Sequence, residues 1–172
     1  MKTLFVLRHG QAVPEASADS DHARELTPRG AAEAQRAAES LLERSNAPSL
    51  ILSSSATRAR QTADACLTAL AGRTELKILD GLYLAEPGPY LAALGLRGEP
   101  HTSVMVVGHN PGLEALIYVL TERSEHLATA SLVEITLPIT SWAELSEVGL
   151  GPHRPTRPNN LGKGSIAHTF RA

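Results

Sequence analysis

Cysteine is scarce in this chain of 172 residues, which contains only Cys66. A single cysteine excludes a framework of internal disulfide bonds and is typical of a reducing compartment. Cys66 falls on the alanine- and leucine-rich face of a helix predicted over residues 57–70. We therefore expect a buried structural thiol there rather than a reactive one.

Long apolar runs and a large net charge are also lacking. No segment reaches the roughly 18 apolar residues of a membrane span. Residues 1–4 lead into a strand pattern without the small-residue cleavage site of a secretory signal. We therefore expect a cytoplasmic protein that contacts no membrane. The formal net charge of −2 gives no electrostatic case for binding nucleic acid.

The histidines show no metal-ligand spacing, such as two histidines one helical turn apart. We therefore assign no metal and no cofactor to this chain. The sequence leaves the oligomeric state open.

The composition predicts one compact domain followed by a tail. A hydrophobic content of 42% over this length is enough for one core, which we place in residues 1–149. Residues 150–172 contain several prolines and glycines, four basic residues and no acidic residue. We interpret them as a basic tail that packs on or extends the same domain. A solvated tail and a basic flap near an anionic substrate are the alternatives.

Short apolar runs alternate with helical patterns along the chain, which is typical of βαβ units. Strands are predicted over residues 2–8, 49–53, 75–79, 103–107 and 131–137, and helices over residues 28–44, 57–70, 89–96 and 111–120. We expect residues 142–148 to pair with residues 131–137 as a hairpin, and residues 165–170 to add a short edge strand. The pattern predicts a three-layer α/β/α sandwich with a mostly parallel central sheet and an antiparallel edge strand.

Side chains suited to phosphate chemistry follow three of the predicted strands. Arg8 and His9 lie at the end of the first strand, Arg58 lies in the helical turn after the second, and His109 follows the fourth. Because the carboxyl ends of parallel strands meet at one edge of a sheet, we expect these residues to converge. A guanidinium offers two parallel donors to a phosphoryl group, and an imidazole can act as a covalent nucleophile.

The order and spacing of five short motifs resemble those of the histidine phosphatase superfamily, which has the phosphoglycerate-mutase-like fold. Within it, they are similar to the SixA-like branch of short bacterial phosphohistidine phosphatases. The matching segments are residues 7–10 (Leu-Arg-His-Gly), 24–30 (Arg-Glu-Leu-Thr-Pro-Arg-Gly), 54–58 with Gln61 and Thr62, 82–85 (Leu-Tyr-Leu-Ala) and 107–112 (Val-Gly-His-Asn-Pro-Gly). The resemblance implies a phosphatase that works through a covalent phosphohistidine intermediate.

The resemblance also implies a role for each side chain at the strand ends. His9 is the expected nucleophile, Arg8 and Arg58 are expected to bind the phosphoryl oxygens, and His109 is expected to donate a hydrogen bond to the transferring group. The further residues expected to bind substrate are Gly10, Ser54 and Asn110. The residues expected to shape the preceding loop, rather than to bind phosphate, are Asp21, Arg24 and Thr27.

A carboxylic acid that would protonate the leaving group is missing from its expected place. Superfamily members that hydrolyse alcohol phosphates carry one after the third strand, whereas the candidates here, Asp80 and Glu86, lie outside that motif. A leaving imidazole needs less protonation than an alkoxide, because its own pKa is about 6.5. The resemblance therefore implies a phosphohistidine phosphatase that acts on a phosphorylated protein.

Two alternatives stay open from the sequence. One is a phosphomonoesterase of the same fold that acts on a small phosphorylated substrate, with Asp80 or Glu86 as the general acid. The other is a non-catalytic phosphate-binding module. Both share the fold, and only the site decides between them.

Overall fold

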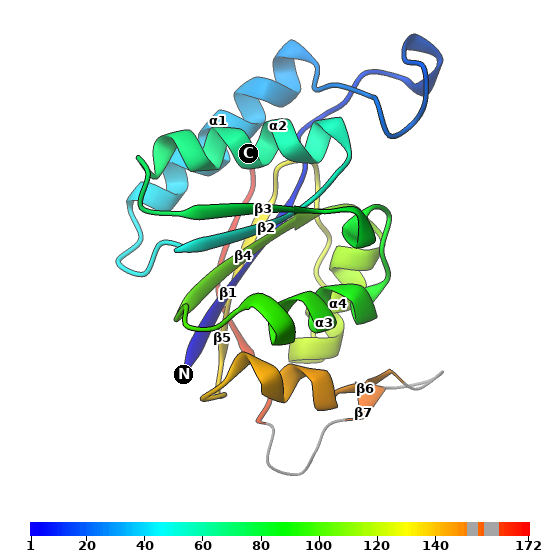
Figure 1. The fold of residues 1–172 in the computed structure, drawn as a ribbon. Helices are drawn as coiled ribbons and strands as arrows, with labels where there is room; N and C mark the ends of the chain where they lie inside the picture. Colours follow the sequence, from blue (N-terminus) through cyan, green and yellow to red (C-terminus); the bar gives the residue numbers. More distant parts are fainter. Residues whose placement is uncertain (151–154, 157–161) are drawn as a thin grey trace.

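A computed structural model describes residues 1–150, 155–156 and 162–172 (Figure 1). Within these residues six strands form one sheet in the order β3-β2-β4-β1-β5-β8. They are β1 (Lys2–Arg8), β2 (Leu50–Ser54), β3 (Glu75–Leu79), β4 (Ser103–Gly108), β5 (Leu132–Leu137) and β8 (Ser165–Phe170). A separate pair is formed by β6 (Gly149–Leu150) and β7 (Pro155–Thr156). Residues 151–154 and 157–161 of the predicted basic tail lie outside the described residues.

Most of the central sheet is parallel. β1 pairs in parallel with β4, and β2 pairs in parallel with both β4 and β3. β5 runs antiparallel to β1, and β8 runs antiparallel to β5. The predicted mostly parallel sheet with antiparallel pairing toward one edge is confirmed, and so is the predicted edge strand in residues 165–170.

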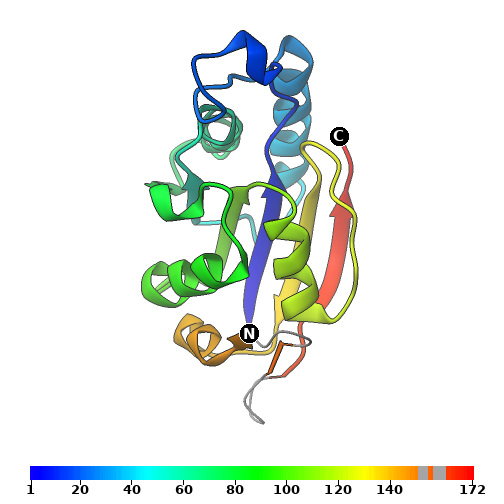
Figure 2. The same ribbon diagram turned by 90° about the vertical axis from the view of Figure 1, so that its right-hand side faces the viewer.

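Helices cover both faces of the sheet, which confirms the predicted three layers (Figures 1 and 2). One face carries α1 (Pro28–Leu42) and α2 (Thr57–Ala69), and the other carries α3 (Pro87–Arg97) and α4 (Gly112–Thr121). Side chains of β1 alternate between the two faces. Phe5 and Leu7 pack with α1 and α2, and Leu4 and Val6 pack with α3 and α4.

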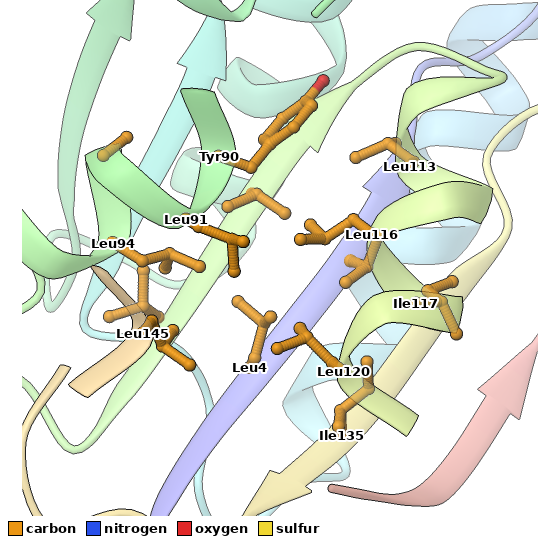
Figure 3. Packing of buried hydrophobic residues seen from close by; sticks show 14 of the residues in the cluster. Leu4, Tyr90, Leu91, Leu94, Leu113, Leu116, Ile117, Leu120, Ile135 and Leu145 are labelled. Atoms are coloured by element: carbon orange, nitrogen blue, oxygen red, sulfur yellow. The ribbon is translucent and has the colours of Figure 1, made fainter. Parts of the chain in front are cut away.

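The core beneath α3 and α4 is rich in leucine and isoleucine, and Figure 3 shows it from close by. Each such side chain stabilises the fold by about 2 kcal/mol when it is fully buried. Tyr90 lies at the upper end of this cluster, and a Cβ at Gly108 would collide with its hydroxyl group. The glycine at the end of β4 therefore leaves room for Tyr90 beneath the carboxyl edge of the sheet.

The predicted hairpin between residues 131–137 and 142–148 is wrong. Trp142–Glu147 form a short 3-10 helix, η3, because Ser141 caps its first turn and the Glu144 carboxylate accepts hydrogen bonds from the Thr140 and Ser141 N–H groups. Trp142 is fully buried, and its indole N–H donates to the His101 carbonyl at 2.7 Å. β8 occupies the place beside β5 instead. The other predicted elements agree with the structure to within two residues at their ends.

The chain that leaves β1 crosses the first turn of α1 at two glycines. A Cβ at Gly10 would collide with the Gly30 carbonyl oxygen, and a Cβ at Gly30 would collide with the Gln11 backbone. Thr27 caps α1 by accepting a hydrogen bond from the Gly30 N–H at 3.0 Å, and its own N–H donates to the Gln11 carbonyl at 2.9 Å. The crossing fixes the segment that directly follows His9.

We expect Gly30→Ala to lower the free energy of unfolding by about 2 kcal/mol or more, because the added methyl group must displace backbone atoms. Urea denaturation followed by circular dichroism measures the change. Gly81→Ala is the matched control, since a Cβ at Gly81 meets no atom within 4 Å. Equal urea midpoints for the two variants would contradict the close crossing.

Candidate active site

The carboxyl ends of three parallel strands bring the predicted residues together. β1 and β4 are neighbours, with Arg8 opposite Gly108, and the His9 N–H donates to the Gly108 carbonyl at 3.2 Å. The rings of His9 and His109 are consequently 5.1 Å apart between centroids. Arg58 enters from the first turn of α2, which follows β2. Arg8, His9, Arg58 and His109 therefore form one cluster, as the strand order requires.

His9 is held as a neutral imidazole with one unprotonated ring nitrogen. Its Nδ1 lies 2.7 Å from the Gly10 carbonyl oxygen, which only accepts, so Nδ1 carries the proton. Its Nε2 accepts a hydrogen bond from Arg58 Nε at 3.2 Å. Burial lowers the pKa of His9 to about 4, and the positive charges of Arg58 and Arg8 act in the same direction. The lone pair of Nε2 is thus present near neutral pH.

His109 is almost completely buried and also neutral. Burial, followed by the charges of His9 and Arg58, lowers its pKa to about 3. Its Nδ1 lies 3.4 Å from Arg58 Nη2, and its Nε2 lies 2.7 Å from Ser54 Oγ. Ser54 is itself fully buried, and its hydroxyl group contacts His109. Its predicted contact with substrate stays a prediction.

Arg8 offers one donor that has no partner. Its Nη1 donates to the Leu127 carbonyl at 2.7 Å. Its Nε is buried, and among the described residues no group accepts a hydrogen bond from it. A buried guanidinium donor without a partner is costly unless a ligand binds it. Arg8 therefore keeps one donor that no described group accepts, and its charge lies close enough to His9 to lower the pKa of that ring.

The peptide groups of Gly10 and the side-chain nitrogen of Asn110 are engaged in the framework of the site, whereas the buried Asn110 Oδ1 has no partner among the described residues. The Gly10 N–H donates to Thr62 Oγ1 at 3.1 Å, and its carbonyl accepts from His9. The Asn110 side-chain Nδ2 donates to Glu114 Oε1 at 2.7 Å and to the Leu127 carbonyl at 3.0 Å. These contacts fix the loops around the histidines. The predicted contacts of Gly10 and Asn110 with substrate stay predictions.

Two residues at the cluster were not predicted as site residues. Asp21 contacts Arg58 directly at 2.9 Å between Oδ2 and Nη2, although the sequence suggested only a role in shaping its loop. Tyr83 donates from its hydroxyl group to Asp21 Oδ2 at 2.7 Å, and its ring meets the His109 ring edge-on at 5.7 Å. Tyr83 could have been predicted as a site residue, because it is a polar side chain that closely follows β3 at the same edge of the sheet.

Asp21 is held as a carboxylate. Partial burial opposes ionisation, but hydrogen bonds from Tyr83, Arg24 and Arg58 hold its pKa well below the usual range. Asp80 and Glu86 are exposed, and no hydrogen bond within the described residues joins either of them to a side chain of the cluster. Asp21, the carboxylate that hydrogen bonds join to the cluster, therefore carries no proton near neutral pH.

The described residues contain no group of three or more histidine, cysteine, aspartate or glutamate side chains placed to hold a metal ion. Among the same residues, no helix is both long and apolar enough to cross a membrane. Cys66 is buried as expected, and burial raises the pKa of its thiol to about 12.

Comparison with known families identifies the class of protein. Residues 4–84 match the sequence model of the histidine phosphatase superfamily, branch 1. An uncharacterised protein of Mycobacterium tuberculosis is 36% identical over 147 residues, which cover 83% of this chain and 88% of that protein. The chain belongs to the histidine phosphatase superfamily, and the protein is a phosphatase.

Solved structures show which members of that superfamily the chain resembles. A SixA protein of Agrobacterium tumefaciens, assigned as a phosphohistidine phosphatase, has a TM-score of 0.76 and 25% identity, covering 99% of this chain and 98% of that one. The protein histidine phosphatase SixA in complex with tungstate has a TM-score of 0.77 and 24% identity, covering 98% of this chain and 96% of that one. The second match shows the shared fold alone. The chain thus resembles the SixA-like branch.

We expect His9 to titrate with a midpoint of about 4, because burial and neighbouring guanidinium groups disfavour the imidazolium. Two-dimensional NMR of the histidine rings measures the midpoint. Arg58→Gln removes one of the positive charges and is expected to raise it. A midpoint at or above about 6.5, the usual value, would contradict the described environment.

The lowered pKa values of His9 and His109 also predict how the free energy of unfolding changes with pH. Between about pH 4 and the usual histidine pKa, His9 and His109 are neutral in the folded state and protonated in the unfolded state. The unfolded state then binds more protons, so the free energy of unfolding rises with pH in this window.

Proposed function

We propose that the protein hydrolyses phosphohistidine, with His9 as the nucleophile. The observation that carries this proposal is the neutral His9 ring, which is fixed through Nδ1 and has Nε2 facing Arg58 beside His109. A nucleophile needs a free electron pair, and this nitrogen has one near neutral pH. Its surroundings supply cationic donors for the oxygens of a phosphoryl group.

In the first step, His9 Nε2 forms a bond to phosphorus as the bond between phosphorus and the leaving nitrogen breaks. Arg58 and Arg8 donate to the equatorial oxygens, where charge is spread in the transition state. The leaving imidazole departs as a neutral ring when its other nitrogen carries a proton. His9 becomes a phosphohistidine.

In the second step, a water molecule attacks this phosphohistidine. The bond between phosphorus and Nε2 breaks, inorganic phosphate leaves, and His9 is restored with its proton on Nδ1. The Gly10 carbonyl holds that proton throughout both steps, so the ring keeps one orientation.

His109 is proposed to donate to a phosphoryl oxygen from Nδ1. Ser54 supports this role, because a serine hydroxyl both donates and accepts and so matches either tautomer of His109. In the described structure Arg58 Nη2, which can only donate, faces His109 Nδ1 at 3.4 Å, so Nδ1 accepts and the Nε2–H donates to Ser54. When a phosphoryl oxygen takes up the Arg58 donor, Ser54 can donate to Nε2 instead, and the ring proton then lies on Nδ1.

The carboxylates of the site favour a phosphoramidate over an alcohol phosphate. Asp21 is ionised, so it has no proton to give to a leaving group near neutral pH. Asp80 and Glu86 are exposed and unattached to the cluster. An imidazole leaves without strong acid assistance, whereas an alkoxide does not.

A phosphorylated protein is the proposed substrate. His9 and Tyr83 are partly exposed, and the Asp21 side chain is 26% exposed, so the cluster is reached from the surface of the molecule. A histidine side chain presented by another protein would fit an open site of this kind. A small phosphorylated metabolite is the competing substrate that the experiments below separate from it.

We expect His9→Ala to abolish turnover of a phosphohistidine peptide while leaving the fold intact, because the motif at residues 7–10 holds no second nucleophile. Phosphate release and circular dichroism measure the two effects. His168→Ala is the control, since His168 is exposed on β8. Turnover by His9→Ala at the rate of the control would rule out the assigned nucleophile.

The missing acid predicts a strong dependence on the leaving group. We expect phosphohistidine and aryl phosphates to have a kcat/KM about 10² times that of alkyl phosphates, since a general acid contributes about 10² to 10⁴-fold. Steady-state kinetics on matched substrates gives this ratio. Glu86→Gln should change neither series. Equal values for alkyl and aryl phosphates, with a large loss in Glu86→Gln, would instead support a metabolite phosphatase.

A further inference from the structure

One carboxylate binds side chains from three separate parts of the chain. Asp21 Oδ2 accepts a hydrogen bond from Arg58 Nη2 at 2.9 Å and from the Tyr83 hydroxyl at 2.7 Å. Asp21 Oδ1 accepts one from Arg24 Nη1 at 2.7 Å. The backbone carbonyl of Asp21 accepts another from Arg58 Nη1. Asp21 therefore holds Arg58 through two acceptors at once.

The loop that carries Asp21 is docked on the first turns of α2. The Thr57 N–H donates to the His22 carbonyl at 3.0 Å, and the Leu26 N–H donates to the Gln61 side chain at 2.7 Å. Both bonds are made by loop residues that closely follow Asp21, and neither involves the side chain of Arg58. The loop consequently fixes the position of the Asp21 carboxylate, which in turn holds the Arg58 guanidinium.

The guanidinium of Arg58 has two edges with different partners. The edge formed by Nε and Nη2 faces His9 Nε2 at 3.2 Å and His109 Nδ1 at 3.4 Å. The edge formed by Nη1 and Nη2 faces Asp21. Two parallel donors on one edge are the arrangement that binds two oxygens of a phosphoryl group. The edge that faces the histidines is the one suited to that task.

We propose that Asp21 is a positioning residue that presents the Nε–Nη2 edge of Arg58 to the transferring phosphoryl group. This inference rests on the proposed function, because it assumes that His9 attacks a phosphoryl group bound by Arg58. An arginine side chain has many rotamers. When acceptors hold its Nη1–Nη2 edge, the Nε–Nη2 edge is left with a single orientation. Tyr83 supports the arrangement by fixing Asp21 Oδ2.

Asp21 affects bound phosphate in two opposing ways. Orienting Arg58 favours phosphate binding, whereas the negative charge of Asp21 repels the anion. The two effects offset each other for phosphate in the ground state. The transition state depends more on the exact direction of the donors, so orientation dominates there. Removing the carboxylate should therefore affect the rate more than the affinity for phosphate.

The experiment compares Asp21→Asn with Asp19→Asn, using p-nitrophenyl phosphate as substrate and phosphate and vanadate as inhibitors. Asp19 lies on the same loop, is exposed, and gives the same change in charge. For Asp21→Asn we expect kcat to fall about 10²-fold and the vanadate Ki to rise by a similar factor, with the phosphate Ki within about threefold of the wild type. Asp19→Asn should behave as wild type.

Tyr83→Phe provides a milder variant that keeps the ring and removes the hydrogen bond to Asp21. We expect it to lower kcat about threefold to tenfold in the wild-type background and to have no effect in the Asp21→Asn background, because both act through Arg58. This variant also serves as the test if Asp21→Asn does not fold, which thermal unfolding reveals.

Each outcome decides between the claims. If the wild type acts through His9 but Asp21→Asn keeps its kcat, the positioning role is wrong and the proposed function stands. The positioning role is also wrong if phosphate and vanadate affinities fall together, or if Tyr83→Phe lowers kcat equally in both backgrounds. If His9→Ala turns over p-nitrophenyl phosphate as fast as the wild type, the proposed function and the positioning role fall together.

Discussion

The contact of the Arg58 guanidinium with two neutral imidazoles and one carboxylate is the interaction on which the rest of the site depends. Burial, with the positive charge of Arg58 acting in the same direction, keeps His9 and His109 unprotonated, and an unprotonated ring is the only form of histidine that can attack phosphorus. The same charge would be too costly to bury alone. Asp21 compensates it, so the arginine can lie 3% exposed beside the reacting nitrogen.

The order of the strands in the sheet brings the residues of this cluster together. Parallel pairing of β1 with β4, and of β4 with β2, places three carboxyl ends at one edge of the sheet. The sequence predicted this much because short apolar strands alternate with helices, and such patterns permit few topologies. The hairpin was predicted wrongly because residues 131–137 alternate like a strand and residues 142–148 follow as the expected partner. The Ser141 cap and the buried Trp142 favour a helix there instead.

The candidate site was predictable to the extent that its residues follow strands. Arg8, His9 and His109 are adjacent to strand ends, and Arg58 lies one helical turn beyond one. Asp21 was not predictable as a contact of Arg58, because its position depends on the long loop between β1 and α1, whose packing on α2 no local sequence pattern reveals. Ser54 was predictable as a site residue, but its contact with His109 depends on rotamers that the sequence does not reveal.

The central claim is that phosphate passes through His9, and a phosphoenzyme measurement tests it most directly. The enzyme is mixed with a peptide carrying labelled phosphohistidine, quenched within milliseconds in alkali, digested and mapped by mass spectrometry. We expect a base-stable, acid-labile phosphate on His9 that disappears as free phosphate forms. Label on any other residue, or turnover at full rate without a labelled enzyme, would contradict it.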